Sequence, residues 1–588
     1  MGTSCRYIKE LTAFSLTDIP CERKPWLKYY GNMSEKIEYN NGSIYDMFTL
    51  AAKKYPNNDA MDYFNTTYTY KQVHKSIDTV ARSLKKMNIV KDECVTICMP
   101  NIPETIFLVY AINKIGAISN VIHPLSSSDE IKHAMEITQS STIFTTDASY
   151  SNVLKTGAEN IVVCDVSNSM PTFMKIAYNV KSKKQMEYDE SSIKWNDFID
   201  KKHSISDTKE NRTKDDPAII IYSGGTTGES KAIVLTNLCF NSIASQCYHV
   251  CKEARAGNSI LSALPIFHGF GLCVSVHVPL MLGLKCILIP KINVKKLNSL
   301  IKKKKPNLLP AIPTMLNAIT NNKSAGKKSL ESVQVILSGG DYLSDDLRKK
   351  VLTYFNECGS NAHIQVGYGL SEATAFIAAT SENIEESDNL GIPNPDTIVK
   401  ICEPETNEEI PDGEIGEICV NGPSVMMGYL NDKDATDNAI RTHKDGTQWL
   451  HTGDLGFIDD GVLHFTSRLK RMIISNGYNI YPTELEKVIS KCKYVAQNVV
   501  VGIKDKIRQE APKVVIVLKK GVERTTEIEN EIREYCKKNI AKNAQPTEYE
   551  FTDQLPTTKI GKVNYRKFEA KNDKADDRKE NHNDKITK

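Results

Sequence analysis

The chain has 588 residues, too many for one hydrophobic core, and this length predicts about two to four structural units. Hydrophobic residues make up 40% and charged residues 25%, and the net charge is only +3. This is the composition of a soluble globular protein, and it gives no electrostatic case for nucleic acid as the main partner. None of the 15 cysteines forms a Cys-x-x-Cys pair, which disfavours a disulfide scaffold or zinc finger and favours reduced thiols in the cytoplasm.

The first clear elements form a β-α-β unit. Strands are predicted over residues 95–99 and 117–122. Between them, Pro103 suits the first turn of a helix that ends near Gly116, because the N–H that proline lacks is unbonded in that turn anyway. Similar alternation recurs around residues 218–221, 286–289 and 333–337. The pattern predicts an α/β fold whose sheets are covered by helices.

Residues 256–290 carry almost no charge, a pattern that also fits a membrane span. Prolines and glycines interrupt this stretch, among them Pro265, Gly269, Gly271 and Pro279. Two short buried elements joined by a glycine turn are therefore predicted instead of a transmembrane segment. The first residues of the chain show no basic-then-apolar signal sequence, so a cytoplasmic location is expected.

The chain changes character in its last third. Short alternating strands are predicted over residues 414–420 and 461–465, next to Asp-Gly pairs that are typical of antiparallel hairpins. After Arg468, a segment of roughly a hundred residues resembles a small α+β domain. Residues 572–588 are nearly all charged or amide residues and are expected to be disordered.

A glycine- and threonine-rich loop runs from Tyr222 to Lys231, between a strand and a helix predicted to start at Thr236–Asn237. Its glycines let successive backbone amides turn inward, which is how loops bind phosphate oxygens. The loop is not a Walker loop, because no Gly-Lys-Ser/Thr closes it. The residues that would contribute are Ser223, Gly224, Gly225, Thr226, Thr227, Gly228 and Lys231. Alone, this loop fits a phosphate site or a flexible surface turn and does not identify a reaction.

Four further motifs follow in order. Residues 367–372 (Gly-Tyr-Gly-Leu-Ser-Glu) offer an aromatic face for a base and a carboxylate for a cation. Residues 450–454 end in Asp454, a carboxylate that could accept two ribose hydroxyls. Arg468 and Lys470 stand where the character of the chain changes, and Lys562 follows a Thr-Lys-Ile-Gly turn. Each motif alone is as well explained by a hairpin turn, a capped helix or a basic surface residue.

As an ordered set these motifs resemble the adenylate-forming (AMP-binding) superfamily, which contains acyl-CoA synthetases, luciferases and peptide-synthetase adenylation domains. The resemblance covers roughly residues 43–567. It implies a large N-terminal domain, residues 1–468, built of helix-covered sheets and a β-barrel-like subdomain. It also implies a small mobile α+β lid domain, residues 469–571, that rotates about a hinge at Lys470.

The resemblance implies a role for each matching residue. Lys562 matches the lysine that bridges the carboxylate and the α-phosphate, and Glu372 matches the magnesium ligand, with Thr226 as a second metal contact. His268 occupies the aromatic gate beside the acyl pocket, and Gly477 would leave room for the pantetheine arm of CoA.

The resemblance also implies the nucleotide site. Tyr368 would stack on adenine beside the Gly339-Gly340 turn, and Asp454 would hold the ribose hydroxyls with help from Arg468. The ATP- and AMP-binding set is completed by Asp341, Gly369, Ser371 and the loop residues given above.

The branch within the superfamily is indicated by residues 468–484, where Met-Ile-Ile precedes a glycine and Asn-Ile-Tyr-Pro follows it. This version is similar to that of fatty-acyl and aryl CoA ligases, including 4-coumarate-CoA ligases. It implies an acid–thiol ligase that uses ATP, Mg²⁺ and CoA on a small carboxylic acid, a medium- or long-chain fatty acid or an aryl acid. Three alternatives remain open: an enzyme that loads a separate acyl-carrier protein, a non-catalytic protein that binds nucleotide or acyl-adenylate, and a membrane scaffold.

The chain departs from its relatives mainly in the phosphate loop. Gly224 stands where serine or threonine is usual, Ser230 where proline is usual and Ala232 where glycine is usual. The missing hydroxyl at Gly224 predicts a raised Michaelis constant for ATP. Since Glu372, Asp454 and the other matching residues are in place, an active enzyme is expected.

Overall fold

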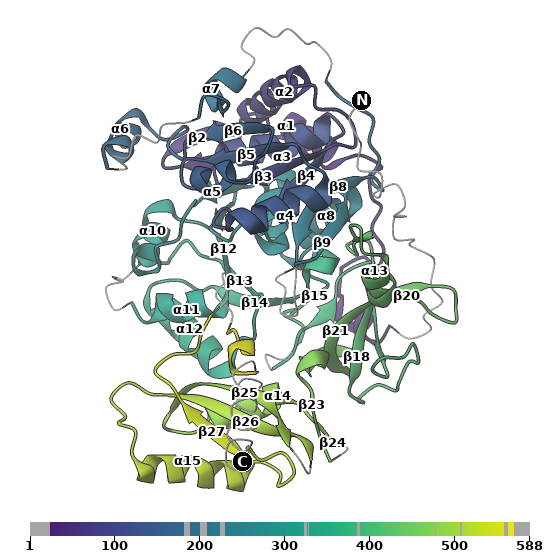
Figure 1. Ribbon diagram of the computed structural model, residues 1–588, viewed down its shortest axis with the longest axis vertical. Coiled ribbons are helices and arrows are strands. Elements are labelled where there is room, and N and C mark those ends of the chain that lie inside the picture. Colours follow the sequence, from purple (N-terminus) through teal and green to yellow (C-terminus); the bar gives the residue numbers. More distant parts are fainter. Residues whose placement is uncertain are drawn as a thin grey trace, which may run out of the picture. The chain divides into compact units, whose positions relative to one another are not determined.

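The computed structural model describes residues 24–181, 189–199, 208–223, 230–322, 326, 328–384, 388–476, 478–505, 508–557 and 563–569 (Figure 1). The chain divides into two compact units. The first comprises Met1–Val399, Val420–His451 and Asp460–Val462; the second comprises Lys400–Cys419, Thr452–Asp459 and Leu463–Lys588. The expected boundary after Arg468 and the hinge at Lys470 stay predictions, and the tail at 572–588 lies outside the described residues.

One sheet of the first unit has eight strands in the order β19-β9-β8-β4-β3-β5-β6-β7. The strands from β8 to β7 are parallel, whereas β9 and β19 add antiparallel to that edge. The bounds are β3 (Cys94–Cys98), β4 (Ile118–Val121), β5 (Thr142–Thr146), β6 (Asn160–Cys164), β7 (Ile193–Lys194), β8 (Pro217–Tyr222), β9 (Ala232–Thr236) and β19 (Gly428–Tyr429). The strands predicted at 95–99, 117–122 and 218–221 are confirmed.

A second sheet of the same unit has nine strands in the order β16-β15-β14-β13-β12-β10-β11-β1-β2. Its central strands, from β14 to β1, are parallel. The bounds are β1 (Asp59–Tyr63), β2 (Thr66–Thr69), β10 (Ser259–Ser262), β11 (Lys285–Leu288), β12 (Leu308–Ala311), β13 (Val335–Gly339), β14 (His363–Tyr368), β15 (Ala378–Ala379) and β16 (Ile392–Pro393). The predicted strands near 286–289 and 333–337 correspond to β11 and β13.

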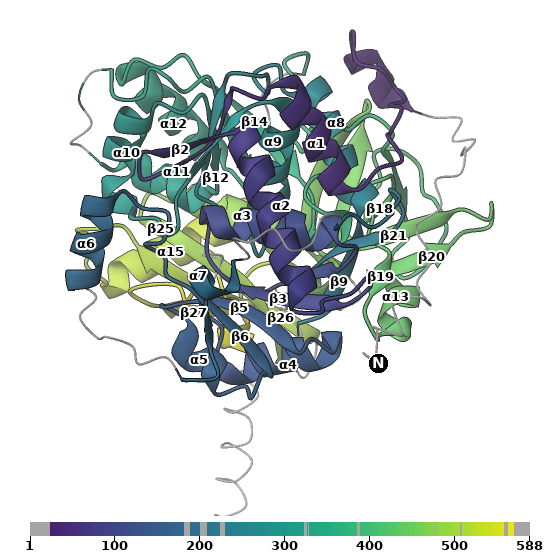
Figure 2. The same cartoon turned by 90° about the horizontal axis from the view of Figure 1, so that it is seen from above.

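Helices cover both sheets. The helices α1 (Ile44–Lys54), α2 (Tyr70–Lys86) and α3 (Pro103–Lys114) lie side by side (Figure 2), and α8 (Asn237–Val250) and α9 (Val278–Leu282) pack against α1. Pro103 is the first residue of α3, as predicted. Residues 103–113 of this helix are buried on every face, so the helix carries no polar stripe. The remaining α-helices among the described residues of this unit are α4 (Ser128–Thr138), α5 (Tyr150–Leu154), α6 (Thr172–Lys181), α7 (Trp195–Phe198), α10 (Leu297–Lys304), α11 (Pro313–Thr320), α12 (Asp345–Glu357) and α13 (Lys433–Ala439).

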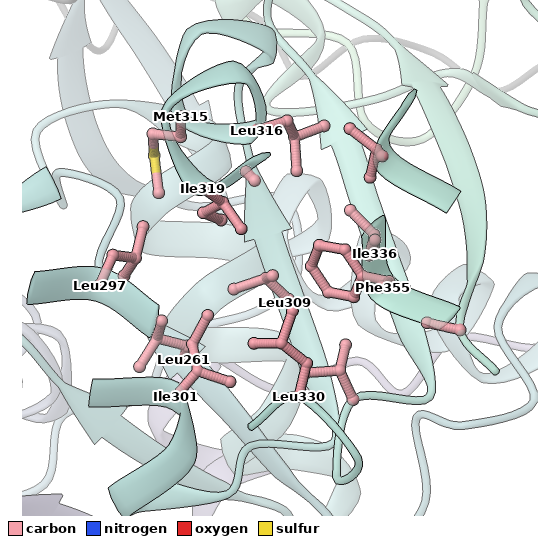
Figure 3. Close-up of a cluster of buried hydrophobic side chains, with 14 of the residues drawn as sticks. Leu261, Leu297, Ile301, Leu309, Met315, Leu316, Ile319, Leu330, Ile336 and Phe355 are labelled. Atoms are coloured by element: carbon pink, nitrogen blue, oxygen red, sulfur yellow. The ribbon is translucent and has the colours of Figure 1, made fainter. Parts of the chain in front are cut away.

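A hydrophobic cluster packs α10, α11 and α12 against the nine-stranded sheet (Figure 3). Leu309 of β12 and Ile336 of β13 are fully buried there, and so is Phe355 of α12. Burial of each such side chain stabilises the fold by about 1.5–3 kcal/mol. This packing fixes the carboxyl ends of β13 and β14, where the motifs that contain Gly339 and Gly367 begin.

The charge-poor stretch at 256–290 folds differently from the prediction of two elements. It contains β10, a π-helix (η3, Phe270–His277) that continues directly into α9, and β11. The glycine turn comes only at Gly283, with φ +83°. Because this helix is buried on nearly all sides, the sequence carries no periodic signal for it. None of the described helices combines the length and apolar character needed to cross a membrane.

His277 closes the π-helix and is buried, with 2% of its surface exposed. Its Nδ1 lies 3.0 Å from the Tyr110 hydroxyl and its Nε2 lies 3.1 Å from Asn241 Oδ1. Burial lowers the pKa of His277 to about 3. A small apolar cavity beside it is lined by Ile106, Phe240, Leu272 and Val276, among others.

We expect His277 to make the free energy of unfolding depend on pH. Below pH 6.5 the unfolded chain protonates this imidazole while the folded chain does not, so stability falls as the pH falls toward 3. Between pH 5.5 and 4.5 this residue should lower the free energy of unfolding by about 1.4 kcal/mol per pH unit. Urea unfolding of wild type and His277→Gln across this range measures the difference in slope; parallel slopes would contradict the prediction.

The second unit contains most of a sheet in the order β17-β18-β21-β20, with β22 paired to β21. A further sheet has the order β24-β23-β26-β25, with β27 paired to β26. The bounds are β17 (Ile398–Cys402), β18 (Gly416–Asn421), β20 (Ile440–Thr442), β21 (Gln448–Asp459), β22 (Val462–Arg468), β23 (Ile473–Ser475), β24 (Tyr478–Ile480), β25 (Val495–Asp505), β26 (Gln509–Leu518), β27 (Glu548–Phe551), α14 (Pro482–Ser490) and α15 (Thr526–Asn539). The predicted strands at 414–420 and 461–465 are confirmed as β18 and β22. The last sheet buries its own core against α14 and α15, as expected of a small α+β domain.

Candidate active site

The two ends of the predicted phosphate loop are joined to each other. The Ser223 amide donates to the Lys231 carbonyl at 3.1 Å, and the Lys231 amide donates to Ser223 Oγ at 3.2 Å. These bonds continue the antiparallel pairing of β8 with β9, in which Tyr222 lies opposite Ala232. The helix predicted at Thr236–Asn237 is α8, and its Cys239 amide donates to the Thr236 hydroxyl, which caps the first turn. The loop residues Gly224, Gly225, Thr226, Thr227 and Gly228 lie outside the described residues.

Glu372, Tyr429 and Lys231 form a connected group. The Tyr429 hydroxyl donates to Glu372 Oε1 at 2.9 Å, and the Lys231 ammonium lies 4.7 Å from the centroid of the Tyr429 ring. Glu372 is half-buried and Tyr429 is 8% exposed. Within the described part of the chain, no lysine or arginine forms an ion pair with Glu372. A half-buried carboxylate without a cationic partner is a suitable place for a metal ion.

The chain makes a strained turn directly after Glu372. A short 3₁₀ turn (η5, Ser371–Ala373) leads into Thr374, which has φ +66° and ψ −58° and is fully buried. The Ala375 amide donates to the Ala373 carbonyl at 2.7 Å, so Thr374 is the centre of a γ-turn that β-branched residues rarely adopt. The Thr374 hydroxyl donates to the Ser424 carbonyl at 2.8 Å, which helps to hold this conformation.

Two glycines allow other segments to approach this turn. A Cβ atom at Gly269 would lie 1.6 Å from the Thr374 carbonyl oxygen, and one at Gly369 would lie 2.1 Å from the Ala375 carbonyl oxygen. Only glycine fits at such distances. The backbone next to His268 therefore lies directly against the turn that follows Glu372.

We expect Gly269→Ala to destabilise the first unit by at least about 3 kcal/mol, the upper end of overpacking costs. The reason is steric alone, because Gly269 has an ordinary helical φ of −53°. Gly326→Ala is the matched control, since a Cβ there meets nothing within 4 Å, and it should change stability by less than about 0.5 kcal/mol. Thermal unfolding of both variants checks this, and similar melting temperatures would refute the contact.

The predicted adenine-binding residues lie together at the ends of β13 and β14. Gly339 pairs with Gly367, Gly340 has φ +80°, and Tyr368 ends β14 with 8% of its surface exposed. Asp341 is exposed, and its Oδ1 accepts a hydrogen bond from the Tyr342 amide at 2.9 Å. The structure thus brings these residues together, and their stacking and binding roles stay predictions.

His268 is half-buried just before the π-helix, and its Nδ1 accepts a hydrogen bond from the Phe270 amide at 3.3 Å. The Phe270 ring lies beside Gly339, where a Cβ atom would be 3.4 Å from it. Phe270 therefore separates the His268 segment from the predicted adenine turn. No role for Phe270 was predicted from the sequence, because an aromatic residue between Gly269 and Gly271 carries no functional signal of its own.

Asp454 and Arg468 belong to the second unit and face each other. Arg468 Nε lies 2.9 Å from Asp454 Oδ1; the Arg468 side chain is half-exposed, whereas Asp454 is 2% exposed. Upstream, the Gly453 amide donates to Glu417 Oε1 at 2.9 Å, and the Asp454 amide donates to Thr452 Oγ1 at 3.1 Å. These bonds orient a carboxylate at the middle of β21. Lys470 is exposed in a 3₁₀ turn (η6, Leu469–Arg471), and Gly477 and Lys562 lie outside the described residues.

Comparison with known protein families identifies the fold. Residues 48–430 match the model of the AMP-binding enzyme family, and residues 484–562 match that of the AMP-binding enzyme C-terminal domain. The chain belongs to the AMP-binding enzyme family. The predicted membership of the adenylate-forming superfamily, the α/β fold with a large and a small domain, and the AMP-forming acid–thiol ligase class are confirmed.

Individual relatives span nearly the whole chain. The long-chain-fatty-acid–CoA ligase of Bacillus subtilis (strain 168) is 29% identical over 570 residues, 93% of this chain and 98% of that protein. The 4-coumarate–CoA ligase 1 of Petroselinum crispum is 29% identical over 84% of this chain and 88% of its own length. The crystal structure of the anthranilate CoA ligase AuaEII in complex with anthranoyl-AMP superposes with a TM-score of 0.79 at 20% identity, over 92% of this chain and 99% of that one.

Proposed function

We propose that this protein is an ATP-dependent acyl-CoA synthetase that activates a medium- or long-chain fatty acid or an aryl acid in the cytoplasm. The observation that carries the proposal is the group formed by Glu372, Tyr429 and Lys231 in a chain of this family. It includes Lys231, which is hydrogen-bonded to Ser223 where the two ends of the predicted phosphate loop meet. Relatives named for long-chain fatty acids and for 4-coumarate support the substrate range.

In the first half-reaction a carboxylate oxygen of the acid attacks the α-phosphorus of ATP. The bond from that phosphorus to the oxygen bridging to the β-phosphate breaks, and pyrophosphate leaves. Both reactants are anionic, so the chain must supply positive charge where they meet. We assign this to Lys231 at the phosphates and to Lys562 between the carboxylate and the α-phosphate.

The Glu372 carboxylate is the proposed magnesium ligand, with the Thr226 hydroxyl as a second contact. The half-buried carboxylate without a described cationic partner fits such an ion. Bound there, Mg²⁺ supplies charge neutralisation for the phosphate oxygens. Asp454 accepts the ribose hydroxyls in this proposal, and Tyr368 positions the adenine.

In the second half-reaction the CoA thiolate attacks the acyl carbonyl of the adenylate, a thioester forms and AMP leaves. In this proposal the pantetheine arm of CoA passes along the backbone at Gly477, and His268 lies at the edge of the acyl pocket. A glycine at Gly477 suits this task because it adds no side chain to the path of the arm.

A pyrophosphate-release assay with a panel of acids, with and without CoA, tests the proposal. Release with fatty or aryl acids, together with CoA-dependent formation of AMP and thioester, is the expected result. Release that a carrier protein stimulates but CoA does not would support the carrier-loading alternative. Binding of ATP without release for any acid would support a non-catalytic protein and overturn the proposal.

A further inference from the structure

Tyr429 was not part of any motif found in the sequence, yet it lies between two groups of the proposed ATP site. It belongs to β19, which pairs antiparallel with β9 so that Tyr429 lies opposite Ile233. The Leu430 amide donates to the Ala232 carbonyl at 2.8 Å, and the Tyr429 amide donates to Thr436 Oγ1 at 2.9 Å. The pairing with β9 and the hydrogen bond to Thr436 of α13 thus fix the backbone of Tyr429 close to Ala232, which directly follows Lys231.

The side chain of Tyr429 has two different partners. Its hydroxyl donates to Glu372 Oε1 at 2.9 Å, and its ring face lies 4.7 Å from the Lys231 ammonium. The Tyr429 hydroxyl is the donor in this contact, because an ionised carboxylate can only accept a hydrogen bond. The Met426 amide also donates to the Glu372 carbonyl at 2.8 Å, which ties the segment before β19 to the backbone of the acidic residue.

This geometry determines how Glu372 presents its two oxygens. A carboxylate that accepts a hydrogen bond at Oε1 cannot rotate freely, and Oε2 then faces a constant direction. Lys231 is exposed and would otherwise sample many rotamers; a cation over an aromatic face within about 6 Å is held by roughly 0.5–1 kcal/mol. One residue therefore limits the motion of both the anionic and the cationic group.

We infer that Tyr429 is a positioning residue that aims the Glu372 carboxylate at a divalent cation and holds Lys231 at the phosphate end of the same nucleotide. This inference rests on the proposed function, since it assigns the cation and the phosphates to ATP. Tyr429 itself touches neither reacting atom.

Two substitutions separate the two contacts. Tyr429→Phe removes the hydroxyl and keeps the ring, and we expect the Mg²⁺ concentration for half-maximal pyrophosphate release to rise about tenfold, the lower range for a hydrogen bond to a charged group. The turnover number at saturating Mg²⁺ and ATP should stay within about twofold. Tyr429→Leu also removes the ring, and we expect a further rise in the Michaelis constant for ATP of about threefold, as for loss of one weak cation–π contact.

A matched control excludes a general effect of losing a buried tyrosine hydroxyl. Tyr30 is 5% exposed and its hydroxyl donates to the Pro393 carbonyl at 2.8 Å, so Tyr30→Phe removes an equally buried hydrogen bond elsewhere in the same unit. This control should leave the Mg²⁺ dependence unchanged. In a Glu372→Gln background, Tyr429→Phe should have no further effect on the Mg²⁺ dependence, because the two residues act through one contact.

Equilibrium binding keeps the inference testable even without turnover. Titration of wild type and Tyr429→Phe with Mn²⁺ in the presence of ATP, followed by electron paramagnetic resonance, should show about tenfold weaker ion binding in the variant. If wild type binds Mn²⁺–ATP but releases no pyrophosphate, the proposed function fails while this comparison still decides the role of Tyr429. Equal Mn²⁺ affinities, or equal shifts in Tyr30→Phe and Tyr429→Phe, would overturn the inference.

Discussion

Replacement of Lys562 by alanine is expected to lower acid-dependent pyrophosphate release at least about a hundredfold, the effect of removing one well-placed charge donor at a developing oxyanion. In the proposed function, Lys562 bridges the carboxylate and the α-phosphate, where two anions must approach each other. The second half-reaction needs no charge at that place, because its nucleophile is a thiolate and its leaving group is already activated. The variant should therefore convert synthetic acyl-adenylate and CoA to thioester at nearly the wild-type rate.

The separation of the two half-reactions is the decisive measurement. Lys567→Ala is a suitable control, since Lys567 is an exposed lysine close by in the sequence, and it should retain both activities. Equal losses of both half-reactions in Lys562→Ala would show that the assignment of this lysine is wrong.

Glu372→Gln is expected to reduce pyrophosphate release by about two orders of magnitude at a fixed Mg²⁺ concentration, which corresponds to losing roughly 2.7 kcal/mol of transition-state stabilisation. The amide keeps the shape of the side chain and can still accept the Tyr429 hydrogen bond, but it carries no charge to hold a cation. The loss should be relieved in part at high Mg²⁺. Initial rates over a range of Mg²⁺ concentrations measure both effects.

Glu210→Gln controls for the loss of a carboxylate in this unit. Glu210 pairs with Lys85 at 2.9 Å on a partly exposed surface, and such pairs contribute about 0–1 kcal/mol. Its replacement should change neither the rate nor the Mg²⁺ dependence. A Glu372→Gln enzyme with wild-type Mg²⁺ dependence would exclude this residue as the metal ligand.

Several parallel strands of the first unit, among them β3 and β4, were predictable because each is a short apolar run bounded by proline, glycine or polar residues. The π-helix was not, because a segment buried on nearly every face has no amphipathic period, and Gly269 and Gly271 resemble turn residues in a linear reading. In the structure these glycines instead permit backbone contacts with Thr374 and Pro265. These glycines are required by tertiary contacts, which a local sequence pattern does not reveal.

The site shows the same limit. Glu372, Asp454 and Arg468 were proposed as site residues because each stands in a short motif, and the structure adds an ion pair of Asp454 with Arg468 that joins two of these motifs. Tyr429 could not be, since its partners Glu372 and Lys231 are 57 and 198 positions away along the chain and meet it only through the pairing of β19 with β9. No sequence motif links residues that only the pairing of distant strands brings together.

The π-helix has a consequence for how the segment that follows His268 tolerates changes in length. A π-helix is an α-helix that carries extra residues for its number of turns, so one residue removed between Phe270 and His277 would leave enough chain for an ordinary α-helix between the same ends. An insertion at the same place has no such alternative conformation. Shortening by one residue should therefore rotate the side chains of Leu272 and Val276 about the helix axis while the strands β10 and β11 stay in place. This offers a way to reshape the region without changing the residues proposed for catalysis.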